Sequence, residues 1–200
     1  MLYPRKIKLN GKDKLVADNQ MVSYREHMTG KCRLLYVSGI ITGETSLHDL
    51  LMAMDTLSHE PIKLVITSPG GEVDSTFLIC DTIKMIKSPI ITIGRYCASS
   101  ACLILASGKE RYLFPHAKTM LHLATGQMGG DYKDFAIQHK LMVNYQNKIV
   151  DILIESGVKR SRDEILIDIE RDFWLEPQEA IEYGLADKII TPEKWRELCQ

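Results

Sequence analysis

Short runs of β-branched and apolar residues alternate with segments of helical period, and this alternation limits the possible folds more than any other feature of the chain. Strand-like runs cover residues 34–37, 62–67 and 90–93. Between them, apolar residues recur every three or four positions over residues 47–57 and 73–86. Alternating strands and helices predict an α/β fold with a largely parallel sheet, in which functional groups gather at the carboxyl ends of the strands.

Beyond residue 110 the pattern predicts two short strands and then a long helix. We expect strands at 112–114 and 119–122, with His116 in a turn between them. A glycine-rich segment at 126–130 precedes a helix over 132–154.

The last forty residues carry signals for two further helices. Ser161 and Glu164 have the spacing of a capping box, and a proline-first helix at 177–183 is followed by Gly184. No linker rich in proline, glycine or serine divides the 200 residues. We predict a single domain over residues 1–200, in which residues 1–30 form a strand or mobile arm followed by a loop.

Composition argues against several classes of partner. The 25 basic and 26 acidic residues are interspersed, so no nucleic-acid partner is expected. No apolar run reaches the length of a membrane span, and the charged N-terminus is unlike a signal peptide, so we predict a cytoplasmic protein. The five cysteines lack metal-ligand spacing, so we interpret them as reduced thiols: Cys32, Cys80, Cys97, Cys102 and Cys199. Neither a metal nor a cofactor is expected.

Two adjacent serines, Ser99 and Ser100, stand where a polar segment passes into an apolar helix. A hydroxyl at this position is most often a helix cap. The alternative is a nucleophile, because free N–H groups at a strand-to-helix turn stabilise an oxyanion. These residues alone do not rank the two serines.

A nucleophilic serine needs a base, and the base needs an orienting carboxylate. His122 ends an apolar run ahead of the glycine-rich segment, and Asp172 lies beside aromatic residues that could exclude water. From these contexts alone, a structural histidine and an ordinary helix-end acid are the favoured interpretations. The turn containing Gly70 and Gly71 suits either a tight connection or N–H donors aimed at a substrate oxygen.

Four motifs in one order identify a resemblance between residues 33–190 and the ClpP family, the serine peptidase subunits of Clp proteases. They are Ile66-Thr-Ser-Pro-Gly-Gly-Glu-Val, Cys97-Ala-Ser-Ser-Ala-Cys-Leu, Pro115-His-Ala-Lys-Thr-Met-Leu-His, and Glu170-Arg-Asp followed by Glu179-Ala-Ile-Glu-Tyr-Gly. The resemblance implies a triad of Ser99, His122 and Asp172, with the backbone N–H groups of Gly70 and Ser100 as oxyanion donors. The Ser100 side chain should then be replaceable.

The resemblance also implies a fold, an assembly and a mode of substrate binding. The fold would be a ClpP/crotonase-like spiral of β-β-α units with a projecting strand and long helix, the handle, over residues 123–157. Gly71, Gly126, Gln127 and Met128 would bind extended polypeptide substrates by strand addition. Two stacked heptameric rings would enclose the sites, and a Clp-type ATPase would be a possible partner.

Other functions compatible with the resemblance are a phage-type processing protease and a catalytically silent ring subunit. A crotonase-type enzyme acting on acyl-CoA is a further alternative, although a filled triad has no evident use there. The chain also departs from the family pattern at Thr67, at Ala101 and after His122, where a common proline is missing. One extra residue stands between Gly94 and Ala98.

Overall fold

The computed structural model describes residues 5–9, 12–16 and 33–199. The first two segments are strands β1 (Arg5–Leu9) and β2 (Lys12–Val16), which pair antiparallel as a separate two-stranded sheet. The rest of the arm predicted over residues 1–30 lies outside the described residues, so that prediction stays a prediction.

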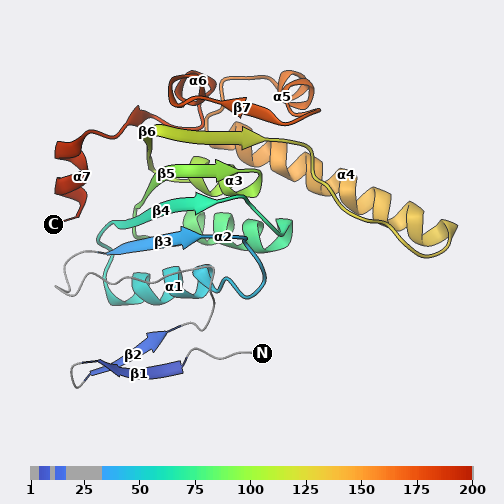
Figure 1. Ribbon diagram of the computed structural model, residues 1–200. Coiled ribbons are helices and arrows are strands. Elements are labelled where there is room, and N and C mark those ends of the chain that lie inside the picture. Colours follow the sequence, from blue (N-terminus) through green and yellow to red (C-terminus); the bar gives the residue numbers. More distant parts are fainter. Residues whose placement is uncertain (1–4, 10–11, 17–32, 200) are drawn as a thin grey trace.

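A six-stranded sheet forms the centre of the fold (Figure 1). Four neighbouring strands run parallel, β7 joins the far edge antiparallel to β6, and β8 pairs parallel with the start of β6. The strands are β3 (Leu34–Ser38), β4 (Ile62–Ser68), β5 (Ile90–Ala98), β6 (Glu110–Leu121), β7 (Phe173–Leu175) and β8 (Lys188–Ile189). The largely parallel α/β sheet predicted from the alternation is confirmed.

Helices cover both faces of this sheet. On one face, α1, α2, α3 and the end of α4 enclose the main core, and on the other α7 covers a smaller cluster that includes Leu34, Ile93 and Leu198. Burial on both faces explains why β4 and β5 read as near-continuous apolar runs. The helices are α1 (Leu47–Leu57), α2 (Val73–Met85), α3 (Ser100–Ala106), α4 (Tyr132–Glu155), α5 (Arg162–Asp168), α6 (Pro177–Tyr183) and α7 (Pro192–Leu198).

The signals predicted for the start of α5 and the end of α6 are confirmed. The Ser161 side chain accepts from the N–H of Glu164, whose carboxylate accepts from the N–H of Ser161 in return. Gly184 ends α6 with φ 98°, a left-handed conformation that glycine adopts without a Cβ penalty. None of the described helices combines the length and the apolar character that crossing a bilayer requires.

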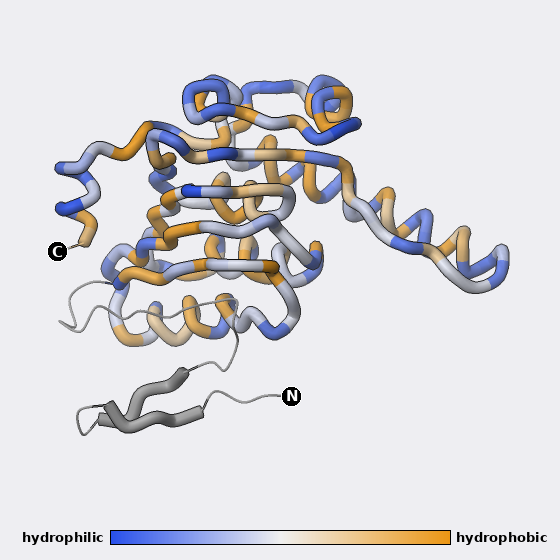
Figure 2. Tube along the Cα trace, viewed as in Figure 1, coloured by the Kyte–Doolittle hydropathy of each residue, from blue (hydrophilic) through white to orange (hydrophobic). Residues whose placement is uncertain are grey.

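The long helix α4 leaves the body of the domain, as expected of a handle (Figure 1). Its last turns are buried through Ile149, Val150 and Leu153, and Tyr145 Oη donates to Asp74 Oδ2 of α2 at 2.6 Å. The projecting part exposes several large hydrophobic side chains: Tyr132, Phe135, Ile137, Leu141 and Val143. Hydrophobic residues recur as orange bands between blue ones along this helix in Figure 2.

Two strand predictions are too short. Strand β5 continues to Ala98, and a single strand β6 replaces the two predicted strands, so His116 lies within a strand rather than in a turn. The β5–β6 register changes between the pairs Gly94–Leu113 and Tyr96–Lys118. Four residues of β6, 114–117, thus lie opposite Arg95 without a pair in β5. Relative to β4, whose pairs pass from Ile66–Gly94 to Thr67–Tyr96, Arg95 is an extra residue in β5, within the segment where the sequence departs from the family length.

A polar cluster ties the start of β3 to α1 and to the loop before β5. Asp55 Oδ1 accepts from both the hydroxyl and the backbone N–H of Ser88, each at 2.7 Å. Arg33 donates to the carbonyl oxygens of Ser58 and Met54 at 2.6 and 2.7 Å. Hydrogen bonds from Ser88 hold the pKa of Asp55 below its usual range.

We expect this cluster to make stability depend on pH in acid. Because the pKa of Asp55 is lower in the folded protein than in the unfolded chain, its contribution is full above the unfolded pKa of about 4 and is lost as the pH falls through the folded pKa. Asp55→Asn should lower the thermal midpoint at pH 7 and flatten its fall in acid. The exposed Asp81→Asn is the control, and equal acid profiles for the two variants would contradict the assignment.

Candidate active site

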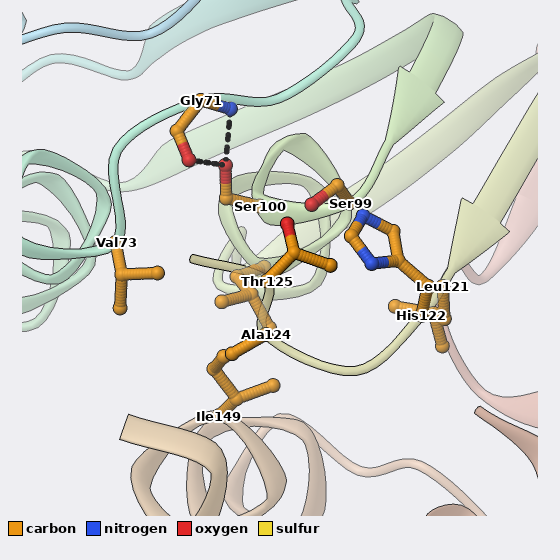
Figure 3. Close-up of a pocket in the computed structure, with 10 residues that line it drawn as sticks. Gly71, Val73, Ser99, Ser100, Leu121, His122, Ala124, Thr125 and Ile149 are labelled. Carbon is orange, nitrogen blue, oxygen red and sulfur yellow. Dashed lines mark hydrogen bonds between the residues drawn. The ribbon is translucent and has the colours of Figure 1, made fainter. Parts of the chain in front are cut away.

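The carboxyl ends of β4, β5 and β6 bring three sequence motifs to one edge of the sheet. The turn after β4 contains Gly70 and Gly71, the β5–α3 junction contains Ser99, and His122 follows the last residue of β6. Gly71, Ser99, Ser100 and His122 line the same pocket (Figure 3). The motifs are far apart in sequence, so the parallel strand order is what brings them together.

Ser99 adopts an unusual backbone conformation at the junction of β5 and α3. Among the described residues it is the one non-glycine whose φ lies well inside the positive range, at 56° with ψ −128°. Such a conformation costs about 1–3 kcal/mol and persists only where the surrounding structure fixes it. Here the Ser99 N–H donates to Met120 O of β6 at 2.7 Å.

The hydroxyl of Ser99 does not act as a helix cap. Ser99 occupies the N-cap position of α3, but its side chain makes no capping hydrogen bond there. The cap interpretation, which the sequence favours for a lone serine, is wrong for this residue. Its partly exposed hydroxyl faces the pocket instead.

Ser100 has the opposite environment. Its side chain is buried, and its Oγ accepts from the Gly71 N–H at 2.8 Å and lies 3.3 Å from Gly71 O (Figure 3). The sequence-based expectation that this side chain is replaceable overlooked these contacts. A tertiary hydrogen bond of this kind leaves no signal in the sequence pattern.

The glycine turn lies directly against the nucleophile candidate. A Cβ built on Gly70, whose φ is 93°, would stand 2.8 Å from Ser99 Cβ and 2.7 Å from Ala98 O. A Cβ on Gly71 would stand 1.9 Å from Ile41 O, because Gly71 forms a bridge with Ile41. Both glycines are therefore needed for close backbone approach.

The two predicted oxyanion donors, the N–H groups of Gly70 and Ser100, differ in their hydrogen-bond acceptors. The N–H of Gly70 donates to Ser68 Oγ at 3.0 Å, and Ser68 Oγ donates to Gly39 O at 2.6 Å. The N–H of Ser100 lies in the first turn of α3, where helical amides have no acceptor within the helix. Sequence analysis missed the part played by Ser68, although its position before Pro-Gly-Gly places it in the turn.

His122 shares the pocket with Ser99, and its imidazole is drawn beside Ser99 in Figure 3. Its Nδ1 lies 2.5 Å from Leu123 O. That contact occupies the ring nitrogen that a triad carboxylate would otherwise hold.

Asp172 and His122 lie at the same end of the β6–β7 ladder. The last pair there is Leu121 of β6 with Phe173 of antiparallel β7, so both residues adjoin that pair just beyond the ladder. The Asp172 side chain is exposed, and within the described chain it makes no hydrogen bond with His122. Trp174 is 47% exposed, so the expected shielding of Asp172 by aromatic residues is not present in this structure.

The segment after His122 runs along α4. Ala124 N donates to Gln146 Oε1 at 2.8 Å, and Gln138 exchanges hydrogen bonds with the N–H and the carbonyl of Gly129. Gly126, Gln127 and Met128 are exposed and form no strand ladder within the described residues, so the strand expected in the handle is not paired here. Their backbone groups are available to another chain.

Buried thiols beside the junction are poor nucleophiles. Burial raises the pKa of Cys97 and raises that of Cys102 to about 12, so both stay protonated at neutral pH. Thr125 and five apolar residues form the rest of the pocket wall: Val73, Leu103, Leu121, Ala124 and Ile149. No group of three or more potential metal ligands occurs in the described part of the chain.

Comparison with known proteins identifies the family of this chain. The Clp protease family model matches residues 22–193. The chain is 36% identical over 188 residues to ATP-dependent Clp protease proteolytic subunit 1 of Protochlamydia amoebophila, covering 90% of this chain and 91% of that protein.

Two further relatives agree. Proteolytic subunit 2 of Pseudomonas aeruginosa is 33% identical over 82% of this chain and 84% of its own length. The proteolytic subunit of Paracoccus denitrificans is 37% identical over 77% and 79%. The glycine turn, the strained serine and the histidine at one sheet edge thus occur in a chain that belongs to the Clp protease family.

Proposed function

We propose that this chain is a serine endopeptidase whose nucleophile is Ser99, and that it cleaves extended polypeptides within an oligomeric chamber. The proposal rests mainly on the difference between the environments of Ser99 and Ser100 at the β5–α3 junction. Ser99 has a strained backbone and a hydroxyl free of capping bonds, whereas the Ser100 hydroxyl is buried and bonded. This contrast ranks the two serines.

In the proposed reaction Ser99 Oγ attacks the peptide carbonyl while His122 Nε2 accepts the hydroxyl proton. His122 then donates that proton to the leaving amine, and a water molecule hydrolyses the acyl-enzyme by the same steps in reverse. The backbone bond from Ser99 N to Met120 O supports the geometry, because it fixes the nucleophile to β6 two residues before His122.

Asp172 orients the imidazole in this proposal. Rotation of the His122 ring away from Leu123 O frees Nδ1–H for the carboxylate of Asp172, the residue immediately before Phe173, which pairs with Leu121. The carboxylate then holds the tautomer with its free lone pair on Nε2. The resting arrangement is thus a latent one that becomes active when the ring turns.

The oxyanion is stabilised by the N–H groups of Ser100 and Gly70. The Gly70 N–H is shared with Ser68 Oγ in the resting structure, and a charged oxyanion is the stronger acceptor. A donor of this kind contributes about 3 kcal/mol to transition-state stabilisation. The closeness of Gly70 to Ser99 Cβ supports this assignment.

Substrate binds as an added strand between the Gly71 segment and residues 126–128. The exposed backbone of Gly126, Gln127 and Met128 provides unpaired groups for such an addition. Val73, Leu103 and Ile149 give the pocket an apolar wall for one substrate side chain. Recognition through the backbone is consistent with broad sequence preference.

Assembly into two stacked heptameric rings, with a Clp-type ATPase as partner, completes the proposal. Its support is the family and the large hydrophobic side chains exposed on the projecting part of α4. Single exposed apolar residues are ordinary, but several on one helix that leaves the body of the domain are typical of an interface. A closed chamber would confine proteolysis in the cytoplasm.

Labelling with a fluorophosphonate probe tests the nucleophile. The wild-type protein should form one adduct on Ser99, because the probe reacts with activated serines, and Ser99→Ala should form none. Peptide mass spectrometry locates the adduct. Ser107→Ala, at the other end of α3, is the matched control and should be labelled normally. Labelling that persists in Ser99→Ala would show that the nucleophile is misassigned.

Native mass spectrometry tests the assembly. We expect a species of about fourteen chains at micromolar concentration, since rings of like subunits close by symmetry. Ile137→Glu combined with Leu141→Glu should halve it to single rings, because charges replace exposed apolar side chains on α4. A wild-type protein that is monomeric or dimeric under these conditions would refute the ring assembly.

A further inference from the structure

We propose that the side chain of Ser100 is a positioning residue, which fixes the glycine turn at the spacing where the Gly70 and Ser100 N–H groups reach one oxyanion. The inference rests on the proposed peptidase mechanism and deepens it. Ser100 would then act twice, through its backbone as a donor and through its hydroxyl as a tether.

The tether joins the turn to α3. Ser100 Oγ accepts from the Gly71 N–H at 2.8 Å and lies 3.3 Å from the carbonyl oxygen of the same residue (Figure 3). The Ser100 residue is only 6% exposed, so water does not replace these bonds at low cost. The hydroxyl is thus held between the donor and the acceptor of a single glycine.

The other hydrogen bonds of the glycine turn do not reach α3. Gly70 O accepts from the Ile41 N–H, the Glu72 N–H donates to Ile41 O, and the Gly70 N–H donates to Ser68 Oγ. These bonds fasten the turn to itself and to the segment after β3. Among the described residues, the Ser100 hydroxyl makes the hydrogen bonds that link residues 69–72 to the β5–α3 junction.

The spacing that the tether fixes is a tight one. A Cβ on Gly70 would stand 3.0 Å from Ser100 N, so the two proposed donors belong to chain segments in direct contact. Oxyanion donors act only when they are fixed at hydrogen-bond distance from the developing charge. A turn free to shift by a fraction of an ångström would still bind substrate but would stabilise the transition state less well.

Kinetics of Ser100→Ala, Ser100→Thr and the control Ser107→Ala test the tether. For a fluorogenic peptide, Ser100→Ala should lower kcat about tenfold and change KM less than about twofold, because the loss falls on the transition state. Ser100→Thr, which keeps the hydroxyl, should recover most of kcat. Ser107→Ala, which loses a hydroxyl bonded to Leu103 O within α3, should match the wild type.

Two further readouts separate positioning from a merely structural role. Affinity for a peptide boronate, which forms a tetrahedral adduct, should fall about tenfold in Ser100→Ala, while affinity for the matching product peptide stays constant. The native mass should match the wild type, and the loss of the buried hydroxyl should lower the thermal midpoint without unfolding the protein at the assay temperature.

The inference is overturned if kcat of Ser100→Ala stays within about twofold of wild type, or if Ser100→Thr fails to restore it. It is also overturned if the loss of kcat is accounted for by unfolding at the assay temperature or by loss of assembly. A wild-type protein without peptidase activity or serine labelling would instead refute the proposed function itself.

Discussion

The parallel ladder of β4, β5 and β6 is the constraint on which the site depends. Its register pairs Ser68 with Cys97 and Ala98 with Met120, so the glycine turn, the β5–α3 junction and the end of β6 reach the same edge. The pairing of the strands alone therefore brings together these three segments, which are far apart in the sequence. The shift at Arg95 belongs to this register, because it sets which residue of β5 arrives opposite Met120 and hence where Ser99 enters the pocket.

Strain and tethering at that edge support each other. The positive φ of Ser99 costs free energy, which the surrounding contacts offset: the Ser99–Met120 backbone bond, the close approach of Gly70 and the buried Ser100 hydroxyl. Burial raises the pKa values of the nearby thiols, so they stay protonated at neutral pH, which is consistent with the proposed hydroxyl nucleophile. Membership in the Clp protease family makes this chain a relative of proteolytic subunits, consistent with hydrolysis at this edge.

Much of the fold could be predicted because it is encoded locally. The signals that predict the helices are short-range: the spacing of apolar residues, the capping box of Ser161 and Glu164, and the glycine at the end of α6. The structure contains the capping box and the left-handed Gly184 as expected. The single strand β6 could not be predicted, since Pro115 and His116 resemble a turn and lie in the unpaired stretch 114–117, between the two parts of β6 that pair with β5. The roles of the two serines depend on a partner from another segment, Gly71, which no local pattern encodes. The orientation of His122 and Asp172 is a matter of rotamers, about which the sequence motifs carry no information.

A crystal structure of the protein with a peptide boronate tests the central claim most directly. We predict a covalent bond from Ser99 Oγ to boron, one boronate oxygen within hydrogen-bond distance of the Gly70 and Ser100 N–H groups, and His122 turned from Leu123 O toward Asp172. A boronate bound to Ser100, or one bound to Ser99 with its oxygen pointing away from both N–H groups, would contradict the account.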